Sequence, residues 1–98
     1  MSRNTVILNG MLIGRDELRF TPAGTPALNF RIGHASEQVE AGRGRSVKLE
    51  IDAVAIGEVA ETLRKMPMEG EYLFKGFLAL RNKLSRYPVL HVNSFELL

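Results

Sequence analysis

The sequence contains no cysteine and no tryptophan. The absence of cysteine excludes a disulfide scaffold, cysteine-ligated structural zinc and a thiol nucleophile, and it agrees with a cytoplasmic location. No apolar run approaches the ~20 residues that a membrane-spanning helix needs. The apolar stretch at residues 6–8 is too short for a secretory signal. We therefore predict a cytoplasmic protein that has no membrane segment.

With 98 residues and 10.9 kDa, the chain has room for one domain, which we place over residues 1–98. Hydrophobic residues make up 45% of the chain and charged residues 24%, which is typical of a globular fold and excludes a disordered one. A domain of this size buries a thin core, and this favours an oligomer.

The net charge is only +2, but the charges are unevenly distributed. Residues 50–71 contain six acids and two bases, whereas residues 72–95 contain four bases and no acid. The stretch 43–48 is also basic and free of acids. Two basic patches on a nearly neutral chain indicate that one side of the protein surface carries its function, although solubility alone would also account for them.

Alternating or continuous apolar residues predict five strands, at residues 5–13, 28–33, 47–56, 72–80 and 89–97. Gly10 and Gly76 predict bends in the first and fourth strands. Between the strands we expect a turn at 20–26, a mobile hairpin loop at 39–46 and a basic loop at 81–88. A helix is predicted at 58–66, where Pro67 ends it.

This order predicts an all-β fold: a five-stranded OB-fold barrel with one helix between strands 3 and 4. Strand parity assigns most aromatic residues to the core. Phe77 has the opposite parity and should face outward, toward a dimer interface or a stacked base, of which we favour the interface. The predicted core aromatics are Phe20, Phe30, Tyr72, Phe74 and Phe95.

Catalysis and metal binding are not expected. His34 and His91 have no acid or second histidine at a metal-binding spacing, and Glu50 and Asp52 could chelate a metal only with a third ligand. No serine lies in a nucleophile-elbow context. We therefore predict a non-enzymatic protein without a cofactor or a metal.

The segments NTVILNG, LRFTPAGTPALNFRI, VAIGEVAETLRK, GEYLFKGFL and HVNSFELL occur in this order along the chain. Together they resemble the bacterial single-stranded-DNA-binding protein family, and within it the short primosomal PriB family. The resemblance covers essentially the whole chain. It implies a homodimer of OB-folds that binds single-stranded DNA during replication restart. It also implies contacts with the primosomal helicase PriA and other primosome proteins.

In an OB-fold, single strands bind across the second and third strands and the adjoining loops. Arg31 should point outward, where it could bridge phosphates, stack on a base, or simply be solvated. Tyr87 could stack on a base or pack locally against Pro88. The bases that we expect to attract phosphate are Arg43, Arg45 and Lys48 in the hairpin, with a Lys48–Glu50 ion pair as an alternative, and Arg81, Lys83 and Arg86 in the second loop.

The resemblance places an aromatic residue of the family at or near Lys48, so binding should depend more on charge than on stacking. Two other functions remain open. An adaptor could dock a primosome helicase through the OB surface with weak DNA binding of its own, or the groove could bind RNA. The acidic stretch 58–71 should lie on the helix side, away from the groove, as a solvated face or a docking surface.

Overall fold

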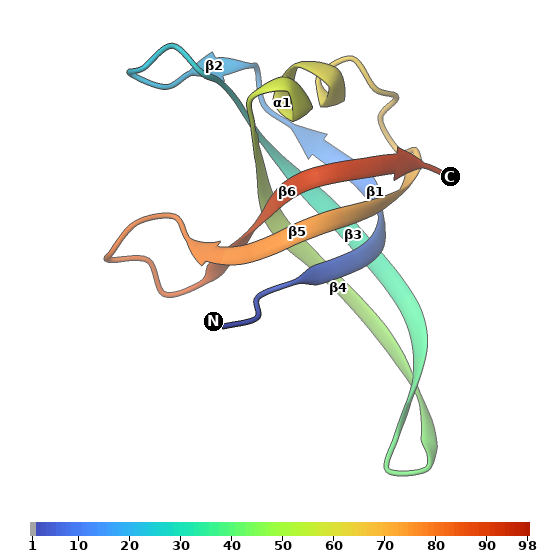
Figure 1. Cartoon of the computed structure of the whole chain (residues 1–98). Helices are drawn as coiled ribbons and strands as arrows, with labels where there is room; N and C mark the ends of the chain where they lie inside the picture. The colour runs from blue at the N-terminus through green and yellow to red at the C-terminus, as the bar shows by residue number, and fades with distance from the viewer. Residues whose placement is uncertain (1) are drawn as a thin grey trace.

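A computed structural model describes residues 2–98. The five long strands close into a barrel in the order β1-β5-β6-β4-β3, and β1 pairs with β3 to complete the ring (Figure 1). All pairings are antiparallel except that of β4 with β6. The predicted OB-fold barrel is confirmed. The elements are β1 (Val6–Arg15), β2 (Arg19–Phe20), β3 (Pro26–Glu40), β4 (Arg43–Ile56), α1 (Glu58–Leu63), β5 (Glu71–Leu80) and β6 (Pro88–Leu97).

The core forms on the inner face of the strands, where alternate side chains meet. Phe30 is buried and its ring centroid lies 5.9 Å from that of Phe74, which lies 5.5 Å from that of Tyr72. Phe95 packs edge-on against Tyr72 at 5.9 Å. The prediction for Phe20 is wrong, since its side chain is 62% exposed. It lies in β2 beside Pro26, at the rim of the barrel rather than within it.

Gly76 allows β5 and β6 to approach closely. A Cβ atom at this position would lie 1.7 Å from the carbonyl oxygen of His91, so no other residue fits without displacing the backbone. The pairing register shifts between Lys75, opposite Ser94, and Gly76, opposite Val92, so Asn93 is the extra residue of a bulge in β6. Gly76, where a bend was predicted, therefore lies opposite an irregularity in β6.

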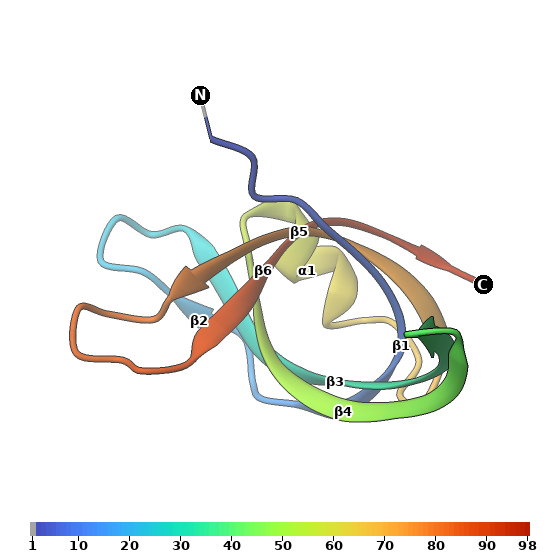
Figure 2. The same cartoon turned by 90° about the horizontal axis from the view of Figure 1, so that it is seen from below.

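The helix α1 closes one end of the barrel, where Figure 2 shows it among the strands. It is shorter than predicted, because only Glu58–Leu63 are α-helical and turns follow. The Arg15 guanidinium donates hydrogen bonds to the carbonyls of Leu63 (3.0 Å) and Met66 (2.7 Å), which fastens the end of the helix to β1. Within residues 2–98, no helix is long and apolar enough to cross a membrane.

Tyr72 links the barrel core to the segment after the helix. Its hydroxyl donates a hydrogen bond to the carbonyl of Pro67 at 2.8 Å, and its side chain is buried. Burial raises the pKa of the Tyr72 phenol above its ordinary value, and the nearby positive charge of Arg15 lowers it to a smaller extent. The native state therefore favours the neutral phenol.

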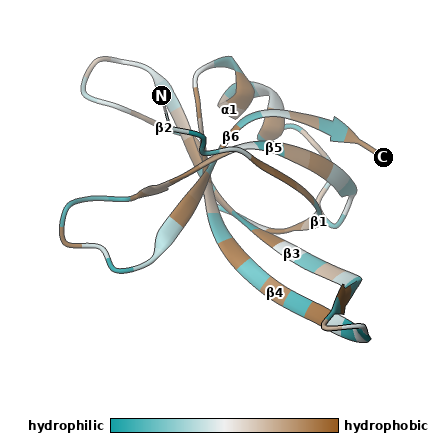
Figure 3. Ribbon diagram, turned by 60° about the horizontal axis from the view of Figure 1, so that its bottom comes forward, coloured by the Kyte–Doolittle hydropathy of each residue, from teal (hydrophilic) through white to brown (hydrophobic). Residues whose placement is uncertain are grey.

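The β3–β4 hairpin projects from the barrel as a long two-stranded ribbon (Figures 1 and 3). The prediction of a loop at 39–46 is wrong, because strand pairing continues to Glu40 and Arg43. Only Ala41 and Gly42 form the turn, with φ of 52° and 77°. Two positive φ angles are typical of the tight turn that matches strand twist. Hydropathy alternates along this ribbon in Figure 3.

Candidate nucleic-acid interface

Strands β1, β3 and β4 present one continuous outer face, and their register identifies its residues. Met11 lies opposite Gly33, and Gly33 lies opposite Glu50. Cross-strand partners point to the same side of a sheet, so these three positions share the face. By the same register Ala35 pairs with Lys48 on this face.

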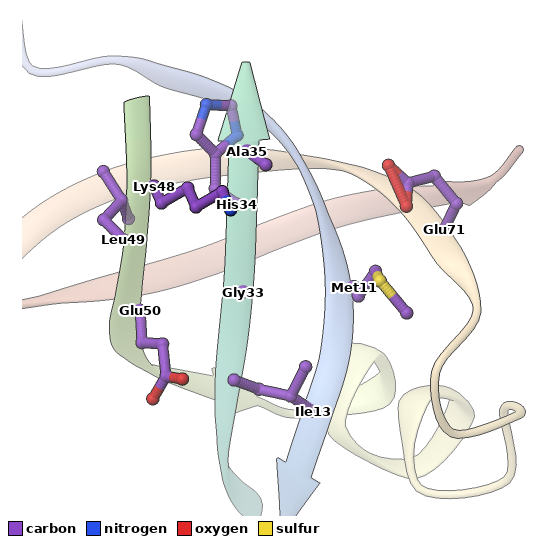
Figure 4. Close-up of a pocket in the computed structure, with 9 residues that line it drawn as sticks. All are labelled: Met11, Ile13, Gly33, His34, Ala35, Lys48, Leu49, Glu50 and Glu71. Carbon is purple, nitrogen blue, oxygen red and sulfur yellow. The ribbon is translucent and has the colours of Figure 1, made fainter. Parts of the chain in front are cut away.

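The first hollow on this face has a volume of about 450 Å³ and is drawn in Figure 4. Its floor is apolar, with Met11 and Ile13 from β1, while Lys48 and Glu50 from β4 supply charge. Ile13 extends toward Gly33 (Figure 4). A Cβ atom built on Gly33 would lie only 3.2 Å from the Cγ2 atom of Ile13. Gly33 therefore lets Ile13 lie across the sheet, a feature that residue parity alone did not indicate.

Two further hollows continue the face toward the loop between β5 and β6. The second, of about 350 Å³, contains Arg31, and the third, of about 230 Å³, contains Tyr87; Asp52 and Arg81 line both. Glu50 of the first hollow is paired with Arg31 of the second. We call these three hollows together the outer groove.

Arg31 lies on the outer face as predicted, but its charge is engaged. Its Nη2 atom donates to Glu50 Oε1 at 3.2 Å, and its Nη1 atom lies 3.4 Å from Asp52 Oδ1. The side chain of Arg31 is 51% exposed. Arg31 is therefore a half-exposed arginine that is ion-paired, and Glu50, the partner in the alternative Lys48–Glu50 ion pair, pairs with Arg31 instead.

The three hairpin bases do not form one patch. Lys48 points into the outer groove, whereas Arg43 and Arg45 have the opposite parity and lie on the other face of the ribbon. Arg45 also donates to Glu40 Oε1 at 2.7 Å. The expectation of no neighbouring acid is wrong for Arg45, because strand pairing brings Glu40 beside it.

The loop between β5 and β6 carries the exposed bases Arg81, Lys83 and Arg86. Across residues 2–98, none of these three forms an ion pair. Arg81 and Arg86 line the third hollow together with Tyr87, whose side chain is 78% exposed. The Tyr87 ring is thus exposed beside two unpaired cations. This favours a ring that can stack on a base over one that packs locally against Pro88.

Acids also reach the outer groove. Glu71, which we expected on the helix side, lines the first hollow because it pairs with Met11 at the start of β5. Asp16 lines the second hollow, next to Asn29 and Arg31. The outer groove is therefore a surface of mixed charge rather than a uniformly basic one.

The histidines and the carboxylate pair are accounted for by contacts within the protein. Glu50 and Asp52 bind Arg31. His34 lies 2.6 Å from the carbonyl oxygen of Asn9 through Nδ1, and 2.8 Å from Ser36 Oγ through Nε2. His91 and Phe77 are stacked at 4.9 Å, outside the outer groove. In the described part of the chain, no three potential ligands gather into a metal site.

The chain is similar to known proteins over nearly its whole length. Residues 4–94 match a family model described as "another single-strand binding protein family". Replication restart protein PriB of Nitrosomonas europaea is 36% identical over 98 residues, which cover 100% of this chain and 91% of that protein. PriB of Bordetella pertussis is 43% identical over 89 residues, covering 91% of this chain and 83% of that protein.

A solved structure of PriB from Ralstonia solanacearum superimposes with a TM-score of 0.90 at 29% identity, covering 98% of each chain. The family match, the two relatives and this structure agree with one another over nearly the whole chain. The chain therefore belongs to the single-strand binding protein family and, within it, to the PriB family of replication restart proteins.

Proposed function

We propose that this protein binds single-stranded DNA in the outer groove during replication restart, without catalysing a reaction. The observation that carries this proposal is a row of three neighbouring hollows on one OB-fold face with unpaired cations at both ends. Lys48 lies at the ribbon end, and Arg81, Lys83 and Arg86 lie at the loop end. Cations spaced along a groove can follow a phosphate backbone, while Tyr87 offers a ring for one base.

Binding should be mainly electrostatic, and the unpaired cations should supply it. Arg43 and Arg45 lie on the other ribbon face and contribute less, because Arg45 is already paired with Glu40. Because its relatives are replication restart proteins, we expect the protein to act in the cytoplasm and to contact the helicase PriA and other primosome proteins. We further propose a homodimer, for which sedimentation equilibrium should give twice the chain mass of 10.9 kDa.

Substitution of single cations tests this proposal. Lys48→Ala and Arg81→Ala should each weaken binding of a labelled oligo-dT and reduce the slope of log K against log salt by about 0.7, the value for one phosphate contact on a single strand. Arg64→Ala, on the exposed end of the helix, is the matched control and should change neither quantity. Wild-type affinity and slope in both groove variants would contradict the assignment.

An adaptor function is the second candidate, and one observation favours it. The outer groove contains Glu50, Asp52, Glu71 and Asp16, so acids oppose a phosphate backbone along its length. A surface of mixed charge could dock a protein instead. If the protein bound PriA but no oligonucleotide even at low salt, the adaptor function would replace DNA binding.

A further inference from the structure

Arg31 is held in a fixed orientation by three neighbouring residues. Its aliphatic stem passes over Gly14, where a Cβ atom would lie 3.8–3.9 Å from the stem carbons. Two different nitrogens of its guanidinium face Glu50 and Asp52, at 3.2 and 3.4 Å. One hydrogen bond and one ion-pair contact from different nitrogens favour one orientation of the guanidinium plane against β4.

The same contacts make Arg31 a poor ligand for phosphate. One positive charge faces two carboxylates, so the sum of the three groups is negative. A phosphate that approached Arg31 would meet Glu50 and Asp52 at nearly the same distance. Like charges placed together are unfavourable, which directs the phosphates to the unpaired cations.

The flat faces of the guanidinium remain usable. The hydrogen bond to Glu50 lies in the guanidinium plane and does not cover its faces, Asp52 makes an ion-pair contact without a hydrogen bond, and the Arg31 side chain is 51% exposed. A guanidinium plane stacks on nucleobases much as an aromatic ring does. Arg31 also lines the second hollow, where Asn29 and Asp16 offer polar groups to the edge of a base and the unpaired Arg81 can reach a phosphate.

We propose that Arg31 is a base-stacking residue of the outer groove, held flat by Glu50 and Asp52, and that it does not bind phosphate. This proposal rests on the proposed function and specifies the contact that Arg31 makes. It also accounts for the first two hollows, which contain no exposed phenylalanine or tyrosine side chain among the residues that line them. The stacking surface there is a guanidinium.

The test compares two labelled strands of about 15 nucleotides, an oligo-dT and an abasic strand with the same phosphates. Arg31→Lys keeps the charge and removes the plane. It should weaken binding of oligo-dT about tenfold and leave both abasic binding and the salt slope unchanged. Arg64→Lys is the matched control, and thermal unfolding should confirm that both variants fold.

A second variant removes the opposing charges. Glu50→Gln combined with Asp52→Asn keeps hydrogen-bond acceptors but frees Arg31 to attract phosphate. It should strengthen binding of the abasic strand and increase the salt slope by about 0.7. An unchanged slope would contradict the counter-charge role of the two carboxylates.

The remaining outcomes separate this inference from the proposed function. If Arg31→Lys weakens both strands equally, or neither, stacking by Arg31 is wrong while DNA binding stands. If the wild-type protein binds neither strand at low salt, the proposed function fails and this inference fails with it.

Discussion

At the scale of single residues, the number of basic side chains free to bind a phosphate is smaller than the number of basic residues in the sequence, because some are ion-paired. Arg31 and Arg45 are both engaged with acids that strand pairing places beside them, whereas Lys48 and Arg81 are not. An exposed ion pair contributes little to stability, typically 0.2–1 kcal/mol. These pairs matter more because they decide which cations can meet a phosphate.

Phe30 and Phe20 differ in burial, and their substitutions should therefore differ in effect on stability. Phe30→Ala should lower the free energy of unfolding by ~3 kcal/mol or more, because it removes a buried ring that packs against Phe74. Phe20→Ala should change it by less than about 0.5 kcal/mol, since its ring is largely exposed. Equal effects in chemical denaturation would mean that the assignment of these two rings is wrong.

Sequence parity identified most inward and outward side chains but not their neighbours. It placed Phe30 inside and Arg31 outside, and both positions are confirmed. It could not foresee Glu40 beside Arg45, because the register of a hairpin depends on where its turn lies. Ile13 of β1 can lie across β3 only because Gly33 has no side chain, and this contact is visible only once the strands are paired.

At the scale of elements, backbone contacts determine where strands can run. Gly76→Ala should destabilise the protein by about 2 kcal/mol or more, because its Cβ atom would overlap the His91 carbonyl and separate β5 from β6. Gly44→Ala is the matched control, since a Cβ atom there meets nothing within 4 Å. Thermal unfolding of both variants checks this, and a stable Gly76→Ala protein would contradict the close approach.

The elements were predicted unequally well, for identifiable reasons. Strong apolar alternation located the five long strands, while β2, with two residues, is too short to carry a periodic pattern. Glycines among charged residues suggested a loop at 39–46, but a two-residue turn needs positive φ only at Ala41 and Gly42. The helix ends at Leu63, and Arg15 of β1 donates hydrogen bonds to the carbonyls of Leu63 and of Met66 beyond it, a long-range contact that the local sequence pattern does not reveal.

At the scale of the whole molecule, the closed barrel buries Tyr72 and thereby couples its stability to pH. The unfolded chain loses the phenolic proton near pH 10, before the folded protein does, because burial raises the pKa of Tyr72. Its contribution to stability is complete below about pH 10 and is lost as the pH rises through the folded pKa.

Tyr72→Phe tests this coupling. The variant should lose about 1 kcal/mol near neutral pH, since the hydrogen bond to Pro67 is removed. Its unfolding temperature should then fall less steeply than that of the wild type above pH 10. Identical alkaline slopes for the two proteins would show that the phenol of Tyr72 does not take part.

The proposed function requires that the outer groove binds single strands. The most direct measurement is fluorescence anisotropy of a labelled oligo-dT of ~30 nucleotides, titrated with protein at several salt concentrations and then with unlabelled competitors. We predict tight binding at low salt that weakens steeply with added salt, and displacement by single-stranded but not by duplex DNA. No binding at low salt, or equal displacement by the duplex, would contradict single-strand binding by the outer groove.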